Sequence, residues 1–239
     1  MKSHTLGPIS LDQPRVVGTV LAFDVLNKLS VETASNCDIV EARLDGFDLS
    51  DPAPALEAIR RVTQLGIPVI ATLRLPIDGG HWQDSDTDRL EVLKAALHVA
   101  STIDIELNST LCADLCALAA ELNKPIIVSH HDFEGTPTPA ELIGLMEKML
   151  AWPNALPKFA LKAHTPEDIC NLMRLAADYA PMRPVCIMGM GDAATATRVA
   201  LPALGTRFTY GYLDRPSAPG QKSSGEILAL LKQLGAPIA

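Results

Sequence analysis

The sequence predicts a single (β/α)₈ barrel that occupies residues 1–239. Eight short runs of apolar and β-branched residues alternate with eight segments of helical spacing. Near-continuously apolar strands that alternate with helices are typical of a parallel sheet covered by helices. An open doubly wound sheet would place a Gly-rich turn after the first strand, but the sequence there is Ala22-Phe23-Asp24. The length also suits one closed barrel.

The predicted strands are short and rich in Val, Ile and Leu, and they lie at residues 15–21, 38–45, 68–74, 102–108, 125–131, 158–163, 184–191 and 208–213. The predicted helices repeat apolar residues every three or four positions, and they lie at residues 25–35, 53–65, 87–100, 109–122, 139–151, 166–179, 194–204 and 225–234. Ser109, Thr138 and Thr165 are suited to cap helix starts. The helix ends coincide with residues that favour a left-handed backbone: Gly66, Asn123, Gly205 and Gly235.

Composition and charge narrow the classes of function. Hydrophobic residues make up 48% of the chain, yet no uncharged apolar run approaches the roughly 18 residues that cross a bilayer. The first residues lack the apolar region of a signal peptide, so we expect a soluble cytoplasmic protein. The net charge of -8 argues against a nucleic-acid partner but allows a local basic pocket for an acidic metabolite.

The five cysteines are scattered, and only Cys112 and Cys116 lie one helical turn apart. A metal site at that pair would need two further ligands that the neighbouring sequence does not offer. We therefore predict that both are buried thiols and that the protein holds no metal.

Ionisable residues gather where the predicted strands end, which is where barrels of this architecture carry their chemistry. In the second strand, alternation places Glu41, Arg43 and Asp45 on one face. The third strand ends at Arg74, followed by a Gly-rich loop with Asp78. Buried charges are costly unless they pair or bind a ligand, so these groups either tie the barrel layers together or form a site.

The fourth, fifth and sixth strands continue this pattern. Asp104 and Glu106 share a face, and the adjacent His130 and His131 must point to opposite faces. At most one of the two histidines therefore belongs to a pocket, and we expect His130 to face the outer helices. A metal site built on both histidines and the following aspartate is disfavoured, because adjacent residues do not converge easily on one ion.

Lys158 and Lys162 also share a face of the sixth strand, and Phe159 and Leu161 point the other way. An amine and a histidine on neighbouring strand ends are the elements of Schiff-base chemistry. The barrel rule alone favours Lys162 as the nucleophile, because it lies nearer the carboxyl end of the strand. The residues themselves leave the choice between the two lysines open.

Several specific motifs occur in order along almost the whole chain. They are Glu41-Ala42-Arg43-Leu44-Asp45, Ser129-His130-His131-Asp132-Phe133 with Thr136-Pro137, Pro157-Lys158-Phe159-Ala160, Arg198, and Ser217-Ala218-Pro219-Gly220-Gln221. With these motifs the chain resembles type I 3-dehydroquinate dehydratase. The resemblance implies a lyase of the shikimate pathway that eliminates water from 3-dehydroquinate in the syn sense through a lysine imine. It also implies that the reaction needs neither a metal nor an organic cofactor.

The resemblance assigns roles residue by residue. The imine-forming lysine falls on Lys158, the general acid and base on His131, and the acidic helper of that histidine on Asp78. The resemblance thereby favours Lys158 over Lys162. The expected substrate-binding residues are Glu41 and Arg43 for hydroxyl groups, Arg74 in the pocket wall, Arg198 for the carboxylate, and Ser217 and Gln221 in a loop over the ring.

The chain departs from the family pattern at four places. Asp78 replaces a glutamate, Tyr210 replaces a phenylalanine, and Lys162 stands at a commonly apolar position. The loop after the seventh strand lacks a usual glycine, and Thr197-Arg198 replaces Ser-Arg. We expect Lys162 either to lower the pKa of Lys158 by charge repulsion or to turn toward solvent.

Two other functions remain open at this point. An aldolase-like barrel would share the lysine chemistry but would not need the Ser217–Gln221 motif. A barrel of the same family that binds a quinate-like ligand without turnover would fit the altered Asp78 and strand-seven loop, although a pure binder would not require both Lys158 and His131. The resemblance also implies a possible homodimer.

Overall fold

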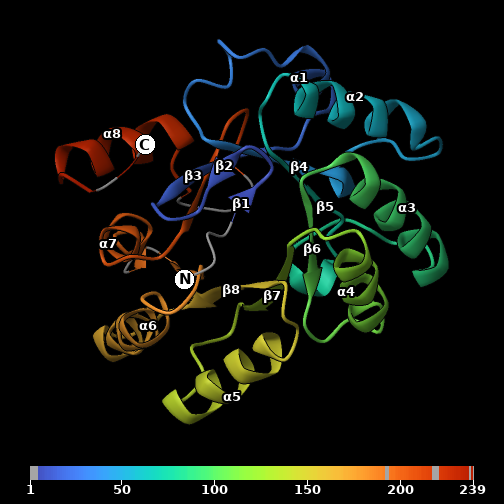
Figure 1. Cartoon of the computed structure of the whole chain (residues 1–239). Coiled ribbons are helices and arrows are strands. Elements are labelled where there is room, and N and C mark those ends of the chain that lie inside the picture. Colours follow the sequence, from blue (N-terminus) through green and yellow to red (C-terminus); the bar gives the residue numbers. More distant parts are fainter. Residues whose placement is uncertain (1–4, 192–193, 217–220, 237, 239) are drawn as a thin grey trace.

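Eight parallel strands form a nearly closed barrel in the computed structural model, which describes residues 5–191, 194–216, 221–236 and 238 (Figure 1). The barrel strands are β3 (Arg15–Val20), β4 (Ile39–Arg43), β5 (Val69–Thr72), β6 (Thr102–Glu106), β7 (Ile126–Asp132), β8 (Ala155–Lys162), β9 (Cys186–Met190) and β10 (Phe208–Tyr212). Their order is β10-β3-β4-β5-β6-β7-β8-β9. Between β9 and β10 the amide of Arg207 donates to the carbonyl of Val185 over 2.8 Å, just before both strands begin. The predicted fold class is confirmed.

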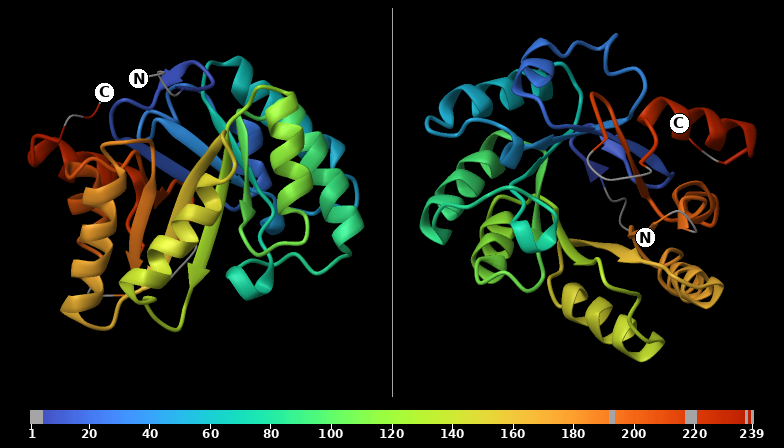
Figure 2. Two further views of the ribbon diagram at one scale, coloured as in Figure 1. Left: turned by 60° about the horizontal axis from the view of Figure 1, so that its bottom comes forward. Right: turned by 180° about the vertical axis from the view of Figure 1, so that it is seen from behind.

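Helices surround the strands on the outside in both views of Figure 2. They are α1 (Phe23–Lys28), α2 (Ala53–Gln64), α3 (Asp86–Val99), α4 (Cys112–Glu121), α5 (Pro139–Leu150), α6 (Pro166–Tyr179), α7 (Thr197–Ala203) and α8 (Ser224–Gln233). Two short 3₁₀ helices, η1 (Leu44–Gly46) and η2 (Pro76–Asp78), follow β4 and β5. No helix in the described ranges is long and apolar enough to span a membrane.

The predicted helix boundaries are largely confirmed. Thr138 and Thr165 cap α5 and α6 with reciprocal hydrogen bonds to Glu141 and Asp168. Ser109 was wrong as the cap of α4, because that helix begins after Leu111. The residues expected to end helices do have positive φ: Gly66, Asn123, Gly205 and Gly235.

The first helix is shorter than the predicted segment 25–35 and ends at Lys28. Arg61 of α2 explains this end, because its guanidinium donates to the carbonyls of Leu26, Asn27 and Leu29 over 2.8 to 2.9 Å. Those carbonyls would otherwise need the amides of a continuing helix. A long-range side chain therefore replaces the last turns that the local pattern predicted.

Two of the three clusters of buried hydrophobic residues, the largest ones, lie on the two sides of the strands. The larger one lies between the strands and the helices and includes Phe159, Leu161 and Ile105. The smaller one fills the barrel itself, where Ile70, Ile127 and other inward side chains meet. Alternation along each strand divides its residues between the two cores.

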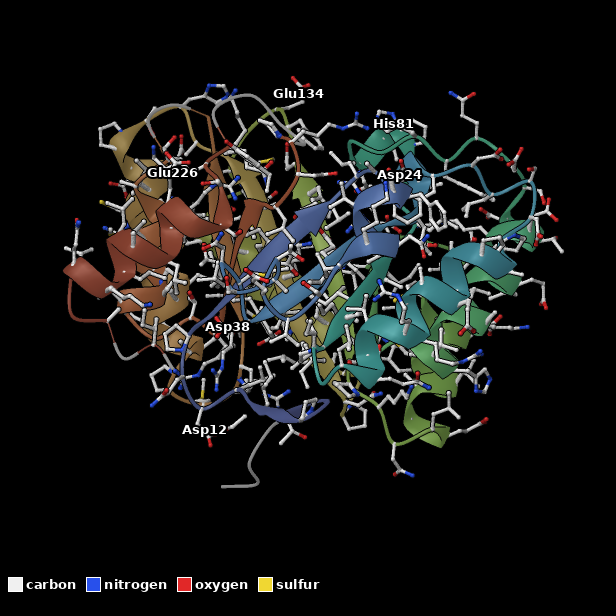
Figure 3. All side chains as sticks on the ribbon, turned by 90° about the horizontal axis from the view of Figure 1, so that it is seen from above. Asp12, Asp24, Asp38, His81, Glu134 and Glu226 are labelled. Atoms are coloured by element: carbon white, nitrogen blue, oxygen red, sulfur yellow. The ribbon has the colours of Figure 1, made fainter. Side chains whose placement is uncertain are left out.

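An N-terminal hairpin, β1 (Thr5–Leu6) and β2 (Ile9–Ser10), was not predicted. Leu6 and Leu11 are fully buried in the inner core, so the hairpin closes the amino-terminal end of the barrel. Figure 3 shows Asp12, which follows the hairpin, at one end of the molecule, and Asp24, His81 and Glu134, which follow barrel strands, at the opposite end. The site described below lies at this second end, where the strands finish.

Candidate active site

A cavity of about 100 Å³ opens at the carboxyl ends of the strands. Its wall contains eight of the nine residues that sequence analysis assigned to the site: Glu41, Arg43, Arg74, Asp78, His131, Lys158, Arg198 and Gln221. Ser217, the ninth, lies outside the described residues. The barrel therefore brings together side chains from β4, β7 and β8, from the segment after β5, from α7 and from the loop after β10.

Lys158 lies inside this cavity and is only 5% exposed. Its Nζ is 2.7 Å from Oδ2 of Asp104 and 3.7 Å from Oε1 of Glu41. The amine also lies over the ring of Tyr210, 4.1 Å from the ring centroid. The nearest ionised groups to this amine are thus carboxylates, which hold it in one place against an aromatic face.

Lys162 lies farther along β8 and is not among the residues that line the cavity. Its aliphatic chain and amine pack beside Gly191, where an added Cβ would lie 3.4 Å from Nζ. Between the two lysines, the fold therefore puts Lys158 in the pocket. The ion-pair partners of Lys158 are Asp104 and Glu41. These contacts give no support to the expectation that Lys162 repels the charge of Lys158.

A buried ion network continues behind Lys158. Arg74 contacts Asp104 through Nη2 at 2.8 Å and Glu106 through Nη1 at 2.7 Å. Burial alone would raise the pKa of Asp104, but Arg74 and Lys158 lower it well below its ordinary value. Burial would lower the pKa of Arg74, and the same carboxylates raise it instead. These groups therefore stay charged, and Asp104 presents a fixed anion to the lysine.

Arg89 completes the network and was missed in the sequence analysis. It lies on α3 without solvent exposure, and its Nη2 is 2.6 Å from Oε2 of Glu106. The sequence carried a signal for it, since Arg89 shares the spacing of the buried residues Val92, Leu93 and Ala96. A charged residue on the apolar face of a helix must reach a buried partner.

Glu41, Arg43 and Asp45, at the end of β4 and just after it, have different partners. Glu41 faces the cavity and accepts hydrogen bonds from Thr19 over 2.9 Å and from Thr72 over 3.0 Å. Arg43 is clamped by Asp45 through two hydrogen bonds of 2.8 and 2.7 Å. Burial would raise the pKa of Asp45, but Arg43 lowers it, so this carboxylate stays ionised. Asp45 thus holds the guanidinium of Arg43 in the wall of the cavity.

The side chain of His131 lies at the end of β7 with 8% exposure and stacks on Phe133 with ring centroids 6.4 Å apart. Its Nδ1 is 3.5 Å from Oδ1 of Asp78, at the outer limit of a hydrogen bond. Burial, followed by the nearby Arg74, lowers the pKa of His131 to about 4. The imidazole is therefore neutral at ordinary pH and free to accept a proton. His130 faces the outer layer, as expected, with its ring edge against Phe159.

A tight loop after β5 carries Asp78 toward His131. Gly79 has a φ of +78°, and a Cβ there would come within 2.7 Å of Phe133. Glycine at this position allows both the left-handed backbone and the close approach of the two loops. With this loop conformation the aspartate side chain comes within 3.5 Å of Nδ1 of His131.

Arg198 approaches the cavity from α7. Its Nη1 donates to the backbone carbonyl of Tyr210 over 2.9 Å and lies 3.5 Å from Sδ of Met188. Burial lowers the pKa of this guanidinium. Among the acidic residues described, none forms an ion pair with Arg198. The guanidinium therefore faces the cavity ready for an anionic group.

The prediction that Cys112 and Cys116 are buried is confirmed. Cys112 and Cys116 are both buried, and their sulfur atoms are 4.0 Å apart. Within the described ranges, no group of three or more His, Cys, Asp or Glu residues is arranged to hold a metal ion.

The residues of the cavity can therefore supply an amine, a neutral imidazole and several guanidinium groups within one enclosure. An amine that attacks a carbonyl and a base that removes a neighbouring proton are the two requirements of imine-based elimination. The guanidinium groups suit a substrate with a carboxylate and hydroxyl groups.

Known proteins agree with this chemistry. A family model described as Type I 3-dehydroquinase matches residues 20–237. The 3-dehydroquinate dehydratase of Methanosarcina acetivorans is 30% identical over 96% of this chain and 98% of its own length. The protein of the same name from Methanothrix thermoacetophila is 32% identical over 99% of both chains.

Solved structures extend the similarity to three dimensions. The 3-dehydroquinate dehydratase of Aquifex aeolicus aligns with a TM-score of 0.77 and 28% identity over 91% of this chain and 96% of its own. That of Geobacillus kaustophilus aligns with a TM-score of 0.86 over 98% and 96% of the two chains, at 22% identity, and so supports the fold.

Proposed function

The chain belongs to the type I 3-dehydroquinase family, and we propose that it is a 3-dehydroquinate dehydratase that works through an imine on Lys158. The observation that carries this assignment is the enclosure in one cavity of a buried amine and a neutral imidazole whose side chain is 8% exposed. The arginines of the same wall fit a hydroxylated carboxylic acid.

Lys158 acts as the nucleophile. Its nitrogen bonds to the carbonyl carbon of 3-dehydroquinate, and the carbonyl oxygen leaves as water. The product of this step is a protonated imine, which withdraws electrons from the adjacent carbon and makes its proton acidic. Asp104, 2.7 Å from the amine, supplies a negative charge beside the cationic imine.

His131 then takes the proton from that adjacent carbon. The electron pair moves into the imine to give an enamine, and the return of this pair expels the hydroxyl group. The imidazolium returns its proton to the departing oxygen, so that one side chain serves as both base and acid on one face of the ring. A water molecule finally hydrolyses the product imine and releases 3-dehydroshikimate.

The other residues of the cavity wall would orient the substrate. Arg198 faces the cavity without an ion-pair partner among the described acids and would bind the carboxylate. Arg43, fixed by Asp45, and Glu41, fixed by Thr19 and Thr72, would bind ring hydroxyls. The loop with Ser217 and Gln221 would cover the ring, and of these two residues Gln221 lies in the described wall.

A purely binding role is not favoured, because a binder has no use for a buried amine beside a neutral imidazole. Assay with 3-dehydroquinate, following the conjugated enone of the product by ultraviolet absorbance, tests the proposal directly. Wild type should turn over without added metal. Absence of turnover, combined with stabilisation of the fold by the ligand, would instead support a binder.

Matched lysine variants assign the nucleophile. Lys158→Met should abolish turnover, since no other amine lies in the described part of the cavity wall, whereas Lys162→Met should retain most of it. Circular dichroism and thermal unfolding check that Lys158→Met is folded, because the change leaves Asp104 and Glu41 without their cation. Full activity in Lys158→Met would refute the assignment, as would loss of activity in Lys162→Met alone.

A further inference from the structure

Tyr210 has a buried hydroxyl group without a hydrogen-bond partner among the described residues. The residue is 4% exposed and forms part of the cavity wall. The other buried hydroxyls nearby are all paired with carboxylates: those of Thr19 and Thr72 with Glu41, and that of Ser129 with Asp104. Among the described atoms of the cavity wall, only Nδ1 of His131 shares this lack of a hydrogen-bond partner, and that atom faces Asp78 at 3.5 Å, whereas the phenol of Tyr210 faces no such group.

An unpaired buried hydroxyl opposes folding, and a catalytic role is one of the reasons for which native proteins keep such a group. The ring of Tyr210 borders the cavity that receives the substrate. A group that enters the cavity is thus the available partner for the hydroxyl, and the missing hydrogen bond points to an oxygen atom of the ligand.

The position of the ring relative to Lys158 indicates which oxygen. The amine lies over the ring face, 4.1 Å from the centroid. The atom that bonds to the amine must therefore lie close above the same ring, and the hydroxyl is attached to the edge of that ring. The backbone holds the ring in place, because Tyr210 pairs with Val17 on β3 and its carbonyl accepts a hydrogen bond from Arg198.

We propose that the hydroxyl of Tyr210 donates a hydrogen bond to the oxygen on the carbon that Lys158 attacks. This proposal rests on the function proposed above and extends it to a further residue. In the bound ketone the acceptor is the carbonyl oxygen, and after attack it is the oxygen of the carbinolamine. Tyr210 would thus be a catalytic residue of imine formation rather than of the elimination.

The chemistry of the step suits a neutral donor. As nitrogen adds to the carbonyl carbon, the oxygen gains negative charge and a preorganised donor stabilises it. The nitrogen attacks once one of its protons has passed to the neutral imidazole of His131, which later delivers that proton to the leaving oxygen. Overall, a ketone and an ammonium group give a protonated imine and water, so both protons of the water come from the nitrogen and none is needed from Tyr210. Burial, followed by the charge of Glu41, raises the pKa of the phenol well above its ordinary value and keeps it protonated.

Tyr210→Phe removes only the oxygen atom and tests the proposal. We expect kcat/KM to fall by about 100-fold, the loss typical of one donor to a developing oxyanion. Rapid quenching with borohydride should show the same slowing in the formation of the trapped imine. The ligand-free variant should unfold at the same temperature as wild type or higher, because a hydroxyl without a partner has been removed.

Tyr179→Phe on α6 is the matched control and should leave all three measurements unchanged. A Tyr210→Phe protein with wild-type kcat/KM would overturn the proposal, and lower thermal stability in that variant would indicate a structural hydrogen bond. Imine formation at the wild-type rate with slow turnover would place the hydroxyl in a later step and also reject it. If wild type itself neither turns over nor traps an imine, the proposed function fails first and Tyr210 loses its assigned role.

Discussion

The surroundings of His131 determine its pKa and therefore its role as a base. Burial and the nearby Arg74 lower its pKa to about 4, whereas Asp78 acts in the opposite direction. The free imidazole is therefore a base throughout the neutral range, and it becomes a cation only as it takes the substrate proton. Asp78 then faces a charged ring, so its contribution is largest at the stage where the charge develops.

This environment predicts the pH dependence of the reaction. The base is active when neutral, that is, above its pKa, so the acid limb of kcat/KM should lie well below pH 6.5. Asp78→Asn removes a group that raises this pKa and should move the acid limb to still lower pH. It should also reduce kcat by about ten-fold, less than the roughly 10²-fold loss of the acid–base group itself, because Asp78 acts through His131 over a long contact.

Asp84→Asn, an exposed change in the same loop region, is the control for that measurement. An acid limb near pH 6.5 in wild type would contradict the assignment of His131 as the base. An Asp78→Asn protein with unchanged kcat would show that Asp78 does not support the histidine.

The sequence identified most of the charged residues of the cavity wall but not the ion pairs that they form. Glu41, His131 and Lys158 were predicted because they lie in recognisable motifs at strand ends. The contacts of Lys158 with Asp104 and of Arg74 with Glu106 join different strands, and no local pattern specifies which partner a buried charge will meet. The same holds for Tyr210, whose place beneath the amine depends on the curvature of the whole barrel.

At the scale of elements, strands and helices with strong periodicity were predicted well, and the short or long-range features were not. The hairpin of β1 and β2 has only two residues per strand, too few to show alternation. The early end of α1 depends on Arg61, which lies on another helix. Tertiary contacts therefore override the local pattern at both places.

The hairpin has a measurable role in stability. Leu6→Ala should lower the free energy of unfolding by about 2 to 5 kcal/mol, because the side chain fills the inner core and leaves a cavity. Urea denaturation measures this change, and Val31→Ala, at a residue that is 61% exposed, is the control. The folded fraction of Leu6→Ala should keep its activity, since the hairpin lies at the end opposite the site. A loss near that of the Val31 control would show that the hairpin is not part of the core.

At the scale of the whole molecule, the barrel converges residues that are far apart in the chain on one enclosure. Glu41, His131 and Arg198 reach it from β4, β7 and α7. The protein carries a net charge of -8, yet three arginines line this cavity. Arg43 and Arg74 are paired with carboxylates, so Arg198, which has no ion-pair partner among the described acids, is the guanidinium that an anionic substrate would meet in this acidic protein.

The central claim is that water is eliminated through an imine on Lys158. Wild type incubated with 3-dehydroquinate and then reduced with borohydride should carry one stable adduct, which peptide mass spectrometry should locate at Lys158. An adduct at Lys162, or steady turnover with no adduct on either lysine, would contradict the account.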